Sequence, residues 1–145
     1  MQIHTTRFGT VDVDERQVIT FPGGLIGFPA GQRFALMDRP EIRPFQWLQA
    51  LDDTELAFIV IDPNVFFPDY DAEIDAVDAQ ALGIETQEDA LVLVIASVGG
   101  ASGARVTVNL LAPIIIGAQQ RLAAQIIQDP TLWSVQTPVP SRQEG

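Results

Sequence analysis

Along most of the chain, hydrophobic and polar residues either alternate or form short apolar runs, and both patterns are typical of β-strands. Residues 11–14 alternate apolar and acidic side chains, as expected for a strand with one face in water. The runs at 57–61 and 91–95 are rich in Val and Ile and predict strands covered on both faces. Shorter apolar runs, most of them bounded by Gly or Pro, predict further strands at residues 17–21, 34–37, 45–51, 105–110 and 114–116. These patterns together predict a mainly β protein.

Two segments carry helical signals of different strength. Residues 76–82 predict a short helix, because Asp75 is placed to cap its first turn and Gly83 to end it. Residues 118–128 (AQQRLAAQIIQ) have helical propensity but lie between two strand signals, so local pattern leaves helix and strand both open. The Gly-rich segment 99–103 predicts a flexible loop within a hairpin.

Length and composition fit one folded domain. A chain of 145 residues with 47% hydrophobic and 19% charged residues is not of the disordered class. We expect a single domain over residues 1–135 and a flexible tail over 136–145, which is polar and contains two prolines. The longest apolar runs are far shorter than the roughly 20 residues of a membrane span, and no signal-peptide pattern is present. A cytoplasmic protein is therefore expected.

The charge of the chain is concentrated in its middle. Nineteen acidic residues face eight basic ones, all of them Arg, for a net charge of −11. Twelve of the acids and none of the bases lie between residues 44 and 104. Such a chain repels the phosphate backbone of nucleic acids and anionic membranes, so direct binding to either is not expected. A basic protein partner is favoured instead.

Few residues are suited to nucleophilic catalysis. The chain has no Cys and no Lys, and its single His, His4, is interpreted as an exposed strand residue. A cluster of acids at Asp62, Asp69, Asp71 and Glu73 leaves a metal site or a paired-carboxylate hydrolase open as an alternative. The cluster lacks the spacing of an EF-hand, so a solvated acidic face is the simpler interpretation. We expect no cofactor, no metal and no small-molecule substrate.

An unusual apolar segment lies inside this acidic cluster. Phe66 and Phe67 are adjacent and flanked by Pro, with Asp69, Tyr70 and Asp71 directly after them. Both rings cannot point to the same face of one strand. They either pack over the end of a barrel or form an apolar patch rimmed by acids, which is the composition of a protein-binding surface.

Several motifs in order along the chain resemble one protein family, that of the flagellar assembly factor FliW. The matching motifs are FG at 8–9, VDVDE at 11–15, VITFP at 18–22, PFQWLQ at 44–49, LAFIVIDP at 56–63, FFPDY at 66–70, LGI at 82–84 and TVNLLAPI at 107–114. The resemblance implies a largely antiparallel, barrel-like single domain with one short helix. In such a fold residues 118–128 would form a turn and a returning strand rather than a helix.

The resemblance also implies a regulator rather than an enzyme. Proteins of this family bind CsrA, a small basic RNA-binding repressor of translation, and also bind flagellin. When flagellin is exported, the freed FliW protein sequesters CsrA without competing for the RNA surface. From chemistry alone we hypothesise that Phe66, Phe67, Asp69, Tyr70 and Asp71 form the partner-binding surface. The alternatives are a carboxylate- or metal-dependent hydrolase-like domain and a structural adaptor unrelated to translation.

Overall fold

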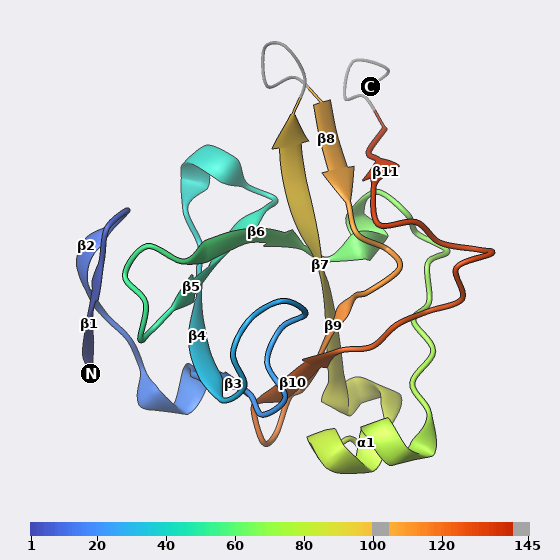
Figure 1. The fold of residues 1–145 in the computed structure, drawn as a ribbon, viewed down its shortest axis with the longest axis horizontal. Coiled ribbons are helices and arrows are strands. Elements are labelled where there is room, and N and C mark those ends of the chain that lie inside the picture. Colours follow the sequence, from blue (N-terminus) through green and yellow to red (C-terminus); the bar gives the residue numbers. More distant parts are fainter. Residues whose placement is uncertain (100–104, 141–145) are drawn as a thin grey trace.

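Seven strands of the protein close into a barrel, and a short helix packs against one end of it (Figure 1). The computed structural model describes residues 1–99 and 105–140. The barrel strands are β3 (Ile19–Phe21), β4 (Gln32–Met37), β5 (Gln46–Ala50), β6 (Ala57–Ile61), β7 (Ala90–Gly99), β9 (Ile114–Gly117) and β10 (Leu122–Gln125). The other described strands and the α-helix are β1 (Gln2–Thr5), β2 (Gly9–Asp12), β8 (Arg105–Val108), β11 (Thr137–Pro138) and α1 (Ala76–Leu82). The described connections include the 3₁₀ turns η1 (Glu15–Gln17), η2 (Pro40–Ile42), η3 (Pro63–Val65) and η4 (Gln87–Asp89).

Strand β7 is shared between the barrel and a second, smaller sheet. One of its edges pairs with β6. On the other edge, residues 90–93 pair with β9 and close the barrel, while residues 96–99 pair with β8, which in turn pairs with β11. Among the described strand pairs only β10 and β3 run parallel, with Leu122 opposite Thr20. The expectation of a mainly β, largely antiparallel barrel with one short helix is confirmed.

Side chains of β6 and β7 point alternately to two separate apolar clusters. Val60 and Leu93 lie in the cluster inside the barrel, together with Phe34 and Leu48. The residues next to them in sequence lie in a second cluster on the outside of the barrel wall. The outer cluster is built on Ile61, Tyr70, Val94, Ala96, Val108 and Leu110. Strands covered on both faces were expected here, and the alternation confirms this.

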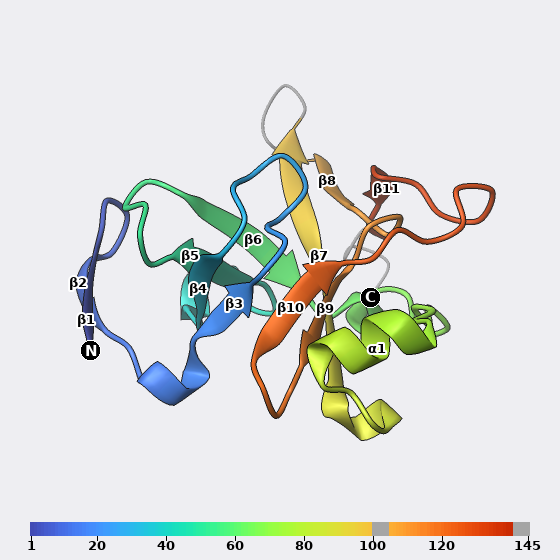
Figure 2. The same cartoon turned by 60° about the horizontal axis from the view of Figure 1, so that its bottom comes forward.

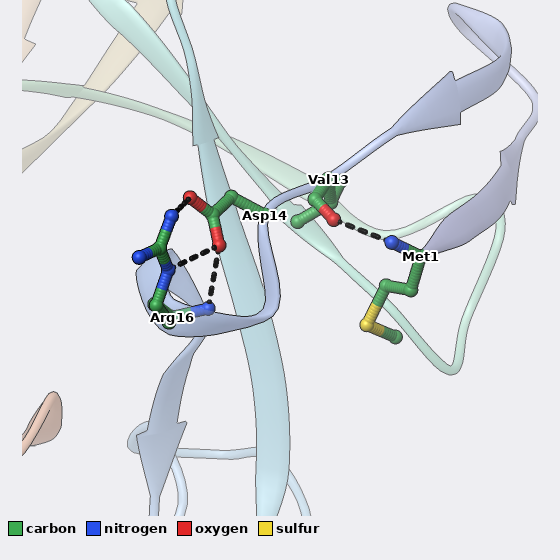
Figure 3. Close-up of polar contacts among 4 residues, drawn as sticks. All are labelled: Met1, Val13, Asp14 and Arg16. Carbon is green, nitrogen blue, oxygen red and sulfur yellow. Dashed lines mark hydrogen bonds and ion pairs between the residues drawn. The ribbon is translucent and has the colours of Figure 1, made fainter.

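The β1–β2 hairpin packs on the opposite side of the barrel from α1 in both views (Figures 1 and 2). Ile3 of the hairpin and Val13, directly after β2, belong to one small apolar cluster with Ala35 and Leu51. At the base of the hairpin the amino group of Met1 donates a hydrogen bond to the carbonyl oxygen of Val13 at 2.8 Å (Figure 3).

The polypeptide leaves the hairpin through an exposed turn held by Asp14. Its carboxylate accepts hydrogen bonds from the backbone N–H of Arg16 at 2.9 Å and from the guanidinium of the same residue at 3.1 and 3.2 Å (Figure 3). The hydrogen bonds from Arg16 hold the pKa of the Asp14 carboxyl below its usual range.

The limits of the helix were predicted correctly from local pattern, whereas the turn and strand in residues 118–128 were predicted only from the family resemblance. The carboxylate of Asp75 accepts from the backbone N–H of Asp78 at 2.8 Å, and Gly83 ends α1 with φ of +73°. Residues 118–121 form a turn and Leu122–Gln125 forms β10, so the returning strand is confirmed and the helical alternative is wrong. Strand pairing with β3 and β9 on both sides outweighs the modest helical propensity of Ala and Gln.

Several strand limits differ from the prediction. The strand expected at 17–21 begins at Ile19, because the preceding residues form η1. The strand expected at 105–110 ends at Val108, since Asn109 turns the chain and its side-chain oxygen accepts from the N–H of Ala112 at 2.9 Å. Within the segment expected to be a flexible tail, Thr137 and Pro138 form β11 and pair with β8. Residues 141–145 and most of the expected loop 99–103 lie outside the described residues.

Candidate functional site

An irregular segment, residues 62–73, covers the outer face of the barrel wall and carries all five predicted site residues. It begins where the carboxylate of Asp62 accepts a hydrogen bond from the N–H of Asn64 at 2.9 Å and starts η3. The side-chain amide of Asn64 then donates to the carbonyl oxygens of Phe67 at 3.1 Å and Tyr70 at 2.8 Å. One Asn side chain therefore folds the segment back on itself and fixes the positions of the aromatic residues.

Tyr70 lies beneath this surface rather than on it. Its side chain is 5% exposed, its hydroxyl donates to the carbonyl oxygen of Leu110 at 2.7 Å, and its ring meets Trp133 edge-on with centroids 4.7 Å apart. Burial raises the pKa of Tyr70 to about 12. Tyr70 is thus a packing residue that holds the segment on the barrel.

The other four predicted residues lie closer to solvent. Phe66 and Phe67 are half-buried against the outer cluster, and the Phe66 ring lies 6.1 Å from that of Phe45. Asp69 and Asp71 are exposed. The structure therefore places two partly covered aromatic rings and two exposed carboxylates on one short segment. Packing accounts for one side of each ring, and contact with a partner stays a prediction for the exposed remainder.

A second segment, residues 126–136, supports the first and was missed by sequence reasoning. Gln128 is buried; its side-chain oxygen accepts from the N–H of Glu73 at 2.8 Å, and its amide donates to the carbonyl oxygen of the same residue at 3.1 Å. Ser134 accepts hydrogen bonds at its carbonyl oxygen from the N–H groups of Leu110 and Leu111. No signal in the sequence distinguishes Gln128 from the exposed glutamines near it, because its role depends on a residue 55 positions away.

A groove of about 460 Å³ runs beside the candidate residues, between the segment 71–74 and the chain around η4. Its lining includes the apolar residues Ile74, Ile84 and Val92 and the acidic residues Asp71 and Glu85. A lining that combines apolar and acidic side chains suits a partner segment that is itself apolar and basic.

The alternative of a carboxylate enzyme finds little in this geometry. Within residues 1–99 and 105–140, no group of three or more His, Cys, Asp or Glu side chains is arranged to hold a metal ion. The carboxylate of Asp62 accepts a hydrogen bond from the backbone N–H of Asn64. His4 is exposed on β1, and its Nδ1 lies 3.1 Å from the hydroxyl of Thr10. In the same described ranges no helix has the length and apolarity needed to cross a membrane.

Comparison with known proteins gives a consistent picture over nearly the whole chain. The family described as FliW protein matches residues 2–139. The flagellar assembly factor FliW of Thermoanaerobacter pseudethanolicus is 41% identical over 140 residues, 96% of this chain and 93% of that protein. That of Treponema pallidum is 41% identical over 133 residues, covering 92% and 87%. That of Natranaerobius thermophilus is 36% identical over 139 residues, covering 96% and 92%.

A solved structure agrees with these sequence relationships. A crystal structure of the flagellar assembly factor FliW superposes with a TM-score of 0.86 at 29% identity and covers 98% of this chain and 99% of that one. The barrel, the helix and the covering segments are thus those of an assembly factor rather than of a known enzyme family. The chain belongs to the FliW family of flagellar assembly factors.

Proposed function

We propose that this protein binds a CsrA-type translational regulator and antagonises it without competing for RNA, and that it also binds flagellin. Release from exported flagellin would free the protein to sequester the regulator, so that flagellin synthesis follows export. Both partners are met where translation occurs, and the protein would therefore act in the cytoplasm. Membership of a family of flagellar assembly factors supports the flagellar part of this proposal.

The distribution of charge carries the proposal. A regulator that binds RNA presents Arg and Lys, and the residues between 44 and 104 of this chain contain twelve acids and no base. Opposite charges raise the rate at which two proteins meet, while buried apolar contacts supply much of the final affinity. Exposed Asp69 and Asp71 beside the half-buried rings of Phe66 and Phe67 offer both kinds of contact.

A capture experiment tests the proposal. The purified chain, immobilised and exposed to a lysate of a motile host at low and high salt, is expected to retain a CsrA-type regulator and flagellin. Retention of the regulator should fall as salt rises, because the attraction between exposed charges is screened. Recovery of neither partner would favour a structural adaptor and reject the proposal.

A pair of variants locates the surface. Phe67→Ala combined with Asp69→Ala is expected to weaken binding of the purified regulator or of flagellin by about tenfold, since it removes an aromatic anchor and a steering charge. Phe28→Ala with Glu55→Ala is the matched control, because it removes a partly exposed ring and an exposed acid elsewhere. Wild-type affinity of a folded Phe67→Ala, Asp69→Ala protein for both partners would remove these residues from the site.

A further inference from the structure

Three large apolar side chains stand exposed on segment 126–136, which projects from the barrel in both views (Figures 1 and 2). Ile127, Leu132 and Val135 are 59%, 66% and 53% exposed, and we call them the apolar ridge. Single exposed apolar residues are ordinary, but three within nine positions of one loop are a feature of binding surfaces. Neither the barrel nor the outer cluster uses these side chains.

The ridge is held in place before any partner arrives. The carboxylate of Asp129 accepts hydrogen bonds from the N–H and the hydroxyl of Thr131 at 2.8 and 2.7 Å, and its carbonyl oxygen accepts from the N–H groups of Leu132 and Trp133 at 3.0 Å. The Trp133 ring packs on buried Tyr70. A loop fixed in this way loses little conformational entropy on binding, which favours affinity.

An acidic hollow adjoins the ridge and shares Ile127 with it. This hollow, of about 310 Å³, is lined by the segment 73–75, by Asp78 of α1 and by residues 126–129. Four of its lining side chains are carboxylates and none is basic: Glu73, Asp75, Asp78 and Asp129. Burial and the neighbouring Asp75 raise the pKa of the Asp78 carboxyl, as expected where like charges gather. The hollow therefore favours a cation.

We propose that the ridge and the hollow together form a docking site for a basic amphipathic segment of the regulator, with Arg or Lys side chains in the hollow and apolar side chains on the ridge. This inference rests on the proposed function and adds a surface beyond the predicted residues. Charge decides the occupant: a second copy of this chain, with a net charge of −11, is repelled by the same carboxylates. The ridge supplies the apolar contact that charge alone does not.

Titration of the purified regulator against the full chain tests the site. Ile127→Ser with Leu132→Ser is expected to weaken binding by about tenfold or more, because it removes the exposed apolar anchors. Val98→Ser with Ile26→Ser is the matched control, since these apolar residues lie elsewhere in the fold and are 55% and 59% exposed, respectively. Equal affinity of the ridge variant and wild type would overturn the inference.

A second pair of variants examines the hollow. Glu73→Gln with Asp78→Asn is expected to lower the association rate several-fold at low salt and to reduce its dependence on salt. Glu55→Gln with Glu88→Gln removes two exposed acids away from the hollow and controls for net charge. Equal losses in both pairs would show general steering and reject the hollow as a site. If the wild-type chain does not bind the regulator, the proposed function fails. If the wild-type chain binds and the ridge and hollow variants bind equally well, the function stands and the docking site is rejected.

Discussion

The two apolar clusters of this protein are held by different means. Inside the barrel, residues such as Phe21 and Phe34 are fully buried on strands whose backbone groups are paired in the sheet. The outer cluster is covered by segments without strand partners, and polar side chains bind their backbone instead: Asn64, Tyr70 and Gln128 each donate to or accept from main-chain groups. Backbone polar groups that leave a sheet still need partners, so an irregular cover over an apolar cluster depends on hydrogen bonds from side chains as well as from the main chain.

The largest expected effect lies inside the barrel. Phe34→Ala should lower the free energy of unfolding by about 3–5 kcal/mol, because it removes a fully buried ring and leaves a cavity beside Phe21. Urea unfolding followed by circular dichroism measures this. Phe28→Ala, at a ring that is 39% exposed, is the control and should cost much less. Equal losses for the two variants would mean that the barrel interior is not the main source of stability.

A smaller and more local effect is expected at Gln128, which supports the segment that covers the outer cluster. Gln128→Ala leaves the N–H and the carbonyl of Glu73 without their partner and should cost about 2–4 kcal/mol. Hydrogen exchange of residues 71–75 and the fluorescence of Trp133 should report the loosening, whereas Trp47 on β5 should not. Gln136→Ala, at an exposed position, provides the control. If both tryptophans respond together, the barrel interior and the cover of the outer cluster unfold as one unit, and the two clusters are not held independently.

Alkaline pH tests the cover of the outer cluster at a single titratable side chain, that of Tyr70. Burial raises the pKa of folded Tyr70 to about 12, above the ordinary value of about 10. Because the folded-state pKa is the higher one, this stabilising effect is complete below about pH 10 and is lost as pH rises to about 12. The chain has one Tyr, no Cys and no Lys, so Tyr70 is the one side chain with an ordinary pKa in this window.

Two measurements follow the titration. Tyrosinate absorbance of the folded protein should give a midpoint near pH 12. In Tyr70→Phe, the free energy of unfolding should no longer depend on pH between about 10 and 12. A tyrosinate midpoint near 10 would contradict the burial of the ring.

The smallest effect is expected at the exposed turn after the hairpin. Asp14→Asn retains an oxygen to accept from the N–H of Arg16 but removes the ion pair, whose two side chains are 45% and 88% exposed. Surface pairs of this kind contribute little to stability, so the melting temperature should not change measurably. A clear drop in the melting temperature would show that this exposed pair matters as much as the buried polar contacts.

The barrel was more predictable than its cover, for a physical reason. The continuous apolar run at 57–61 indicates a strand covered on both faces, and the caps of 76–82 are local in sequence, so both could be predicted. The parallel pairing of β10 with β3 joins residues about a hundred positions apart and leaves no local mark. Helical propensity in 118–128 was misleading because tertiary pairing, which composition does not report, determines the outcome.

The candidate site was only partly readable from sequence. Phe66 and Phe67 next to acidic residues suggested a binding surface. The sequence does not show that Tyr70, unlike them, is buried, because its hydroxyl bonds to a residue 40 positions away. The apolar ridge of Ile127, Leu132 and Val135 was missed, since an apolar residue in a loop has the same pattern whether it is covered or exposed.

The divided edge of β7 has a consequence for solubility. A closed barrel has no free strand edge, but the branch to β8 creates one again, and such edges promote pairing between separate molecules. Strand β11 covers this edge, and its Pro138, opposite Thr107, has no N–H to offer to a further strand. Strand β11 therefore protects the molecule against aggregation by strand addition where β8 extends the barrel wall.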